Sequence, residues 1–124
     1  MMTEALKKTI LVVDDAPENI HLIKGLLGRQ FKIKAALEGE KALKIAVKGA
    51  DLILLDIQMP GMDGFEACRR LKEQPDTAAI PVVFLSGEEE AEHKERAAEL
   101  GAASFFSKPV DPIQFSRFVF KLLE

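Results

Sequence analysis

The stretch "DLILLDIQMPG", residues 51–61, joins an apolar run to a carboxylate and then to a turn. Residues 52–55 are all Leu or Ile, which is typical of a strand that other elements cover on both faces. Asp56 follows directly, and Pro60-Gly61 then breaks the chain into a loop. Asp56 could simply be a turn former. A charged group at the tip of a strand that avoids water could also belong to a functional site.

Short apolar runs of this kind predict five strands, at residues 9–13, 31–36, 51–55, 80–85 and 103–107. Four runs are nearly continuous in apolar character, whereas the second alternates with Lys32 and Lys34, as an exposed edge strand does. Amphipathic stretches with helical spacing follow the runs. Five strand–helix alternations predict an α/β fold: a doubly wound, five-stranded parallel sheet with five helices and right-handed crossovers.

The predicted helices present apolar faces to this sheet at helical spacing. The members of these faces are Ile20, Ile23, Leu26, Leu27, Ala42, Leu43, Ala46, Val47, Phe65, Cys68, Leu71, Phe115, Phe118, Val119 and Leu122. The fourth helix is strongly charged and ends with Ala97, Ala98 and Leu100. Gly101 predicts the end of the fourth helix, and Asp111-Pro112 predicts the N-cap and first turn of the fifth. Cys68 lies on an inner face, so we expect burial rather than reactivity.

The composition restricts the class of protein. The chain has 124 residues, 48% hydrophobic and 30% charged, which fits one globular domain. The net charge is −3 and the basic residues form no stripe, which argues against nucleic-acid binding. One cysteine excludes an internal disulfide, and no stretch resembles a signal peptide or a membrane span. We therefore expect a cytoplasmic protein with no membrane contact.

Polar side chains follow four of the five predicted strands. They are Asp14 and Asp15 after the first strand, Asp56 after the third, Ser86 after the fourth and Lys108 after the fifth. If the strand order is 2-1-3-4-5, which is common in doubly wound folds, the remaining strand is the edge and these side chains share one ligand crevice. Asp14 or Asp15 could instead cap the helix that follows. One site, however, accounts for all four strands together.

The chemistry of such a cluster follows from its charges. Two carboxylates about 4 Å apart repel by about 4 kcal/mol at an effective dielectric constant near 20, so the acids need protons or a cation. Mg²⁺ prefers oxygen ligands, including carboxylates and phosphates. Lys108 can pair with a phosphoryl group, and Ser86 offers a hydroxyl donor. We interpret the cluster as a phosphoryl-transfer site with Asp56 as the nucleophile and Asp14 and Asp15 as metal ligands.

Four segments carry a resemblance that covers residues 8–123. The segments "ILVVDD", "LLDIQMPGMDG", "PVVFLSG" and "ELGAASFFSKP" occur in this order. With them, the chain resembles the response-regulator receiver domain of bacterial two-component signalling. The resemblance implies a flavodoxin-like receiver fold over residues 1–124, and we expect no output domain in this chain.

The resemblance also implies a phosphoacceptor and a cofactor. Asp56 would accept the phosphoryl group, and Mg²⁺ would be the cofactor. Asp15 would ligate the metal directly and Asp14 through water or hydrogen bonds. Asp56 and the backbone carbonyl of Gln58 would complete the protein ligands.

Further roles are implied at the ends of the last two predicted strands. Ser86 corresponds to the Thr or Ser switch residue of the family, and Lys108 to its phosphate-binding lysine. Phe105 lies at the aromatic switch position, where the family often has Tyr, so the hydroxyl is missing here. The Lys108–Pro109 peptide bond is expected to be cis.

In this family the phosphoryl donor is a phosphohistidine on a sensor histidine kinase or a histidine phosphotransfer protein. A receiver catalyses its own phosphorylation and often its dephosphorylation, and is otherwise not an enzyme. Phosphorylation would change the face of the fourth helix, fifth strand and fifth helix, which binds a downstream protein, an attached output domain or a second copy. Ile113 and Phe120, roughly opposite the inner stripe of the last helix, are either covered by flanking segments or part of that interface.

Three other functions compete with this one. A phosphohydrolase of the haloacid-dehalogenase-like class would have a second Asp where this chain has Gln58. A flavodoxin-like cofactor binder would need a hydroxyl-rich phosphate loop, whereas "DDAPEN" is acidic. A receiver that is never phosphorylated is disfavoured because every residue that the chemistry needs is present. His21 and His93 have no partner at ligand spacing, so we expect surface or packing roles.

Overall fold

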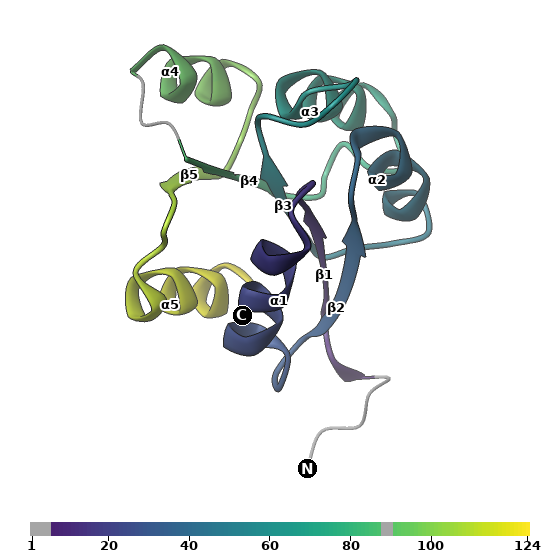
Figure 1. Cartoon of the computed structure of the whole chain (residues 1–124). Helices are drawn as coiled ribbons and strands as arrows, with labels where there is room; N and C mark the ends of the chain where they lie inside the picture. The colour runs from purple at the N-terminus through teal and green to yellow at the C-terminus, as the bar shows by residue number, and fades with distance from the viewer. Residues whose placement is uncertain (1–5, 88–90) are drawn as a thin grey trace.

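The computed structural model of the protein describes residues 6–87 and 91–124, along which strands and helices alternate (Figure 1). The elements are β1 (Thr9–Val13), α1 (Pro17–Leu27), β2 (Lys32–Ala36), α2 (Gly39–Ala46), β3 (Leu52–Asp56), α3 (Gly64–Glu73), β4 (Val82–Ser86), α4 (Ala91–Glu99), β5 (Ser104–Ser107) and α5 (Pro112–Leu122). The predicted alternation is confirmed. Within these ranges, no helix combines the length and the apolar character needed to cross a membrane.

The strands form one parallel sheet in the order β2-β1-β3-β4-β5. Val13 of β1 pairs with Leu55 of β3, and Asp56 of β3 pairs with Leu85 of β4. The predicted strand order is therefore confirmed, and the lysine-containing β2 lies at an edge. Because parallel strands run in the same direction, their carboxyl ends meet at one edge of the sheet.

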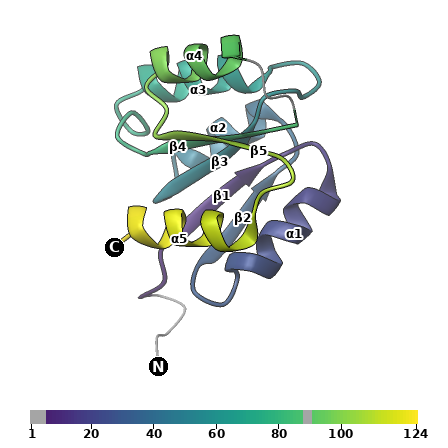
Figure 2. The same cartoon turned by 90° about the vertical axis from the view of Figure 1, so that its left-hand side faces the viewer.

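Helices cover both faces of the sheet. Helices α1 and α5 lie on one face, and α2, α3 and α4 lie on the other (Figures 1 and 2). Successive side chains of a strand point to opposite faces. In β3, Ile53 and Leu55 join the core under α2, α3 and α4, while Leu52 and Leu54 join the core under α1 and α5. All four are 0% exposed, and the burial of each contributes about 2 kcal/mol.

Four of the five strands differ from the sequence prediction by one or two residues at an end. Strand β4 begins at Val82 rather than at residue 80, because Pro81 has no N–H to donate to the ladder. Strand β3 includes Asp56 as its last residue. The carboxylate therefore belongs to the strand itself and is placed by its pairing, rather than by the loop that follows.

The helix ends agree with the prediction, whereas one apolar position does not. The Asp111 side chain caps α5 by accepting hydrogen bonds from two backbone N–H groups, each at 3.0 Å. Gly101, just after α4, has a φ of +84°, which glycine adopts without strain. The assignment of Val47 to an inner face is wrong, because this residue is exposed. Helix α2 ends at Ala46, so Val47 lies beyond its inner stripe.

Gly64, the first residue of α3, lies against the tip of β3. Its N–H donates a hydrogen bond to the carbonyl of Ile57 at 2.8 Å. A Cβ at this position would stand 2.8 Å from the Cα of Ile57 and would overlap the carbonyl oxygen of Asp56. Only a residue without a side chain lets α3 begin this close to Asp56.

We expect Gly64→Ala to lower the free energy of unfolding by about 2–3 kcal/mol, because the added methyl group would push α3 away from the end of β3. Urea denaturation measures the change. Gly25→Ala is the matched control: no atom of the described residues lies within 4 Å of a Cβ there, and α1 should gain up to about 1 kcal/mol in helix propensity. A Gly64→Ala variant as stable as the wild type would contradict the tight packing of α3.

Candidate functional site

An open cleft of about 760 Å³ lies at the carboxyl edge of the sheet. The side chains predicted at the four strand tips all line it, and they are Asp14, Asp15, Asp56, Ser86 and Lys108. Gln58, in the loop after β3, lines the cleft as well. The sheet thus brings together residues as far as 94 positions apart in sequence.

Asp14 is buried and held by three donors. Its Oδ1 accepts a hydrogen bond from the N–H of Ala16 at 2.9 Å. Its Oδ2 accepts one from Asn19 Nδ2 at 3.1 Å and one from Lys108 Nζ at 2.9 Å. Helix α1 has Ala16 at its N-cap position and no side-chain cap bond. The capping interpretation of Asp14 and Asp15 is therefore wrong.

Lys108 connects the two buried carboxylates. Its Nζ lies 2.9 Å from Asp14 Oδ2 and 3.3 Å from Asp56 Oδ1, and the N–H of Ile57 donates to the same Asp56 oxygen at 2.9 Å. Burial raises the pKa of Asp56, and the charge of Asp14 raises it further, against the opposing effect of Lys108. Burial alone would lower the pKa of Lys108, but its contacts with Asp14 and Asp56 together raise it. The ammonium is therefore held charged between the carboxylates.

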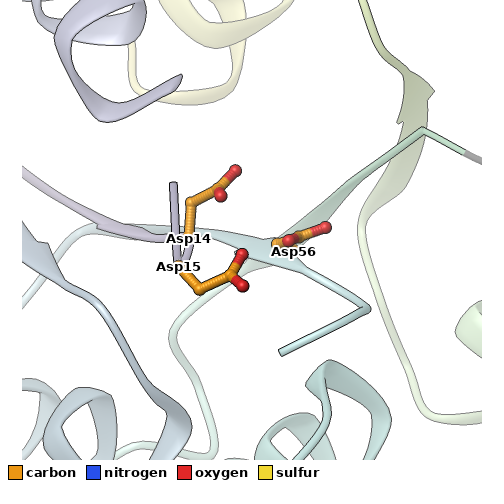
Figure 3. A group of neighbouring side chains, drawn as sticks. All are labelled: Asp14, Asp15 and Asp56. Carbon is orange, nitrogen blue, oxygen red and sulfur yellow. The ribbon is translucent and has the colours of Figure 1, made fainter. Parts of the chain in front are cut away.

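Three carboxylates that line the cleft, those of Asp14, Asp15 and Asp56, are neighbours (Figure 3). One oxygen from each of Asp14, Asp15 and Asp56 lies within 4.8 Å of the other two, and of the three residues only Asp15 is exposed. Lys108 supplies a single positive charge, which leaves the cluster negative. Three hard oxygen donors at this spacing fit a divalent cation such as Mg²⁺, whose charge would offset their repulsion.

Ser86 and Lys108 lie at the ends of neighbouring strands. Ser86 is buried at the last position of β4, and its carbonyl accepts a hydrogen bond from the backbone N–H of Lys108 at 2.7 Å. The Lys108–Pro109 peptide bond is cis. Among the residues that the structure describes, no atom lies within 4 Å of where a Cβ on Gly87 would stand. The end of β4 therefore leaves space for a ligand beside the serine.

Three residues given functional roles from sequence do not line the cleft. Phe105 is half-buried on β5, with Lys94 Nζ 5.9 Å from its ring centroid. Ile113 and Phe120 lie on α5 and are 64% and 40% exposed. The rings of Phe120 and Phe31 are in contact, with centroids 5.2 Å apart. Among the residues that the structure describes, Phe31 thus covers part of Phe120, while Ile113 stays largely open.

Several residues that line the cleft had no site role predicted from the sequence, among them Asn19, Asp63, Phe65 and Arg96. Asn19 holds Asp14, and Asp63 caps α3 by accepting a hydrogen bond from the N–H of Glu66 at 2.9 Å. Periodicity assigns Phe65 to the inner face of its helix and says nothing about a cleft. An arginine in a highly charged helix carries no signal in the sequence.

The two histidines and the cysteine lie mostly at surface or packing positions. His21 is exposed on α1. His93 packs its ring against Phe65, with centroids 5.5 Å apart, and also lines the cleft, which the sequence analysis did not foresee. Cys68 is buried, and burial raises the pKa of its thiol, so the reactive thiolate is disfavoured.

Comparison with known proteins finds relatives of this chain in both sequence and structure. The sequence matches the family model of the response regulator receiver domain over residues 10–119. A probable cyclic di-GMP phosphodiesterase of Vibrio cholerae is 42% identical over 94% of the chain, which spans 27% of that relative. Protein PilH of Pseudomonas aeruginosa is 34% identical over 82% of the chain and 86% of PilH. The structure of Vibrio cholerae chemotaxis protein CheY4 is 27% identical, with a TM-score of 0.87 over 94% of this chain and 99% of that one.

We expect Asp56→Asn to raise the free energy of unfolding by about 1 kcal/mol at pH 7 without divalent cations, because it removes a buried charge that Asp14 repels. The advantage should disappear in acid. The folded-state pKa of Asp56 lies above the ordinary 3.8, so the wild type recovers stability as the pH falls through that raised pKa, and recovers it fully below 3.8.

Urea denaturation in EDTA across this pH range measures the difference between the two proteins. Ser107→Ala serves as a control at the end of β5, since Ser107 is half-buried and does not line the cleft. An Asp56→Asn variant that is less stable than the wild type at pH 7 would contradict the electrostatic account of the site.

Proposed function

The chain belongs to the response regulator receiver family, and on this basis we propose that Asp56 accepts a phosphoryl group from a phosphohistidine donor. The observation that carries the proposal is the contact of Lys108 Nζ with both Asp14 and Asp56, beside the carboxylate of Asp15. These groups supply a nucleophile, a neutralising ammonium and oxygen ligands for a cation in one cleft.

Asp56 would attack through Oδ2. Its Oδ1 is held by the N–H of Ile57 and by Lys108, which orients the carboxylate. In the transfer, the carboxylate oxygen forms a bond to phosphorus and the phosphorus–nitrogen bond of the donor breaks; the donor ring carries a proton on its other nitrogen, so it leaves with the electron pair as neutral imidazole. The product is an acyl phosphate, and the ionised carboxylate has no proton to lose.

Other groups of the cleft would stabilise the transferring phosphoryl group. The Lys108 ammonium would neutralise charge on the phosphoryl oxygens, and the Ser86 hydroxyl would donate a hydrogen bond to one of them. When bound by the three carboxylates and the backbone carbonyl of Gln58, Mg²⁺ would supply Lewis-acid stabilisation of the same oxygens. The cation ligands and Lys108 stand on different strands, so the sheet sets their spacing.

Phosphorylation would act on the rest of the domain through Ser86. The phosphoryl group adds nearly two negative charges and new acceptor oxygens, toward which Ser86 would move. Phe105 would then turn inward and change the face formed by α4, β5 and α5. Because Phe105 has no hydroxyl, packing rather than a side-chain hydrogen bond would govern that movement.

The proposed partners follow from the direction of transfer. A sensor histidine kinase or a histidine phosphotransfer protein would supply the phosphoryl group. The recipient of the signal would be an attached output domain, a separate protein or a second copy. The chain spans about a quarter of the Vibrio cholerae relative but 86% of PilH, so the relatives support both attached and separate recipients. A cyclic di-GMP phosphodiesterase module is one candidate for the recipient.

Turnover of external substrates is the alternative that the residues disfavour. Apart from their own phosphorylation, receiver domains are generally not enzymes. A phosphohydrolase of the haloacid-dehalogenase-like class needs a second carboxylate two positions after the nucleophile, where Gln58 stands. The acidic lining at Asp14 and Asp15 likewise disfavours a flavin phosphate at the end of β1.

With Mg²⁺ and acetyl phosphate, the intact wild-type protein should gain the mass of one phosphoryl group, and Asp56→Asn should gain none. EDTA should abolish the gain, and Asp15→Asn should require more Mg²⁺ for the same rate, because it removes a cation ligand. Intact-mass spectrometry over time measures each case. An undiminished gain in Asp56→Asn, or no gain in the wild type with either acetyl phosphate or a phosphohistidine donor, would contradict the proposal.

Ile113→Ser should weaken association of the phosphorylated protein with itself or a partner about tenfold, because burial of one isoleucine contributes at least about 1.5 kcal/mol. Ile113 is a cleaner test than Phe120, whose ring also packs on Phe31. Sedimentation velocity with and without acetyl phosphate measures self-association. Val47→Ser, which removes another exposed apolar side chain after α2, is the control. Unchanged association of Ile113→Ser with both itself and the partner would rule out this interface.

A further inference from the structure

Arg96 of α4 forms part of the wall of the cleft. Its guanidinium lies over the ring of Phe65 on α3, with Cζ 4.5 Å from the ring centroid, which is the geometry of a cation–π contact. Phe65 is 2% exposed and packs against Phe84 of β4, with ring centroids 5.4 Å apart. A ring anchored in the core therefore holds the guanidinium at the edge of the cleft.

The cations of α4 are divided between two environments. Arg96 lines the cleft, together with His93 one turn earlier, whose ring contacts the same Phe65. Lys94 lies in between in sequence but approaches Phe105, and it lines a different hollow beside β5. Substitution of Arg96 therefore removes a charge that lines the cleft, whereas substitution of Lys94 removes a charge of the same helix that lies outside it.

The positive charge of Arg96 takes no part in the ion pairs among Asp14, Asp56 and Lys108. The charged aspartate, lysine and arginine side chains that line the cleft are Asp14, Asp15, Asp56, Asp63, Lys108 and Arg96. Lys108 is engaged by Asp14 and Asp56. Within residues 6–87 and 91–124, no carboxylate forms an ion pair with Arg96. Without Arg96, four carboxylates would face one lysine and a bound divalent cation, and the remaining negative charge would repel an anionic donor.

We propose that Arg96 is a specificity-determining residue that attracts small anionic phosphodonors, such as acyl phosphates, to Asp56. This inference rests on the proposed function of Asp56. A guanidinium offers paired N–H donors that match two phosphoryl oxygens, and a cation at the mouth of a cleft raises the rate of encounter with a dianion.

Arg96 takes no part in the bond changes. The Asp56 carboxylate oxygen bonds to phosphorus, the bond between phosphorus and the acetyl oxygen breaks, and acetate leaves with the electron pair. Because Arg96 acts before this step, its effect falls on the second-order rate constant at low donor concentration, and it depends on ionic strength.

The test compares wild type, Arg96→Gln, Arg96→Lys and Lys94→Gln in Mg²⁺ with increasing acetyl phosphate. Intact-mass spectrometry gives the second-order rate constant at ionic strengths of about 50 mM and about 1 M, between which the screening length falls from above about 10 Å to about 3 Å. Arg96→Gln should lose about threefold to tenfold at low ionic strength and less than about twofold at high ionic strength. Arg96→Lys should keep most of the rate, and Lys94→Gln should match the wild type at both.

The outcomes separate this inference from the function on which it rests. An Arg96→Gln rate within twofold of the wild type at low ionic strength would overturn it. So would an equal loss at both ionic strengths, which indicates a packing role for Arg96, or an equal loss in Lys94→Gln, which indicates a general effect of helix charge. A wild type that is never phosphorylated would overturn both the inference and the proposed function, whereas normal phosphorylation of Arg96→Gln would overturn the inference alone.

Discussion

The contact of Lys108 with Asp14 and Asp56, at 2.9 Å and 3.3 Å, is the interaction on which the rest of the site depends. Burial of these charges has a desolvation cost that offsets much of their attraction, so the pair is not in itself a source of stability. The raised pKa of Asp56 reflects the same opposition between desolvation, which raises it, and the charge of Lys108, which lowers it. A cluster with one lysine and three carboxylates is instead suited to further charges, those of a divalent cation and a phosphoryl group.

The parallel sheet fixes the positions of these buried charges. Asp56 ends a strand whose preceding residues are buried on both faces, and Gly64 packs α3 directly against that end. A shift of one residue in the pairing of β3 would exchange the side chains between the two faces of the sheet and expose the wrong set to each core. The carboxylate therefore keeps its place near Asp14 because the whole core opposes any movement.

Phe65 connects this core to the mouth of the cleft. Its ring packs on Phe84 within the core, and the Arg96 guanidinium lies over the same ring. Helix α4 thereby touches the cleft through Arg96 and touches Phe105 through Lys94. Helix α4 thus contacts both the cleft that contains the proposed phosphorylation site and Phe105, from which the conformational change would spread.

Sequence alone predicted the α/β class, the five strands and the polar residues at the strand tips, because apolar runs and helical periodicity are local patterns. The strand order was instead taken from the order that is common in doubly wound folds. Local patterns could not show that Asp14 accepts a hydrogen bond from Lys108 instead of capping α1, or that Val47 is exposed. They gave no sign that Asn19 and Arg96 line the cleft. These features depend on which helix packs over which strand, and on contacts between residues as far as 94 positions apart, which form only when the sheet brings its strand ends together.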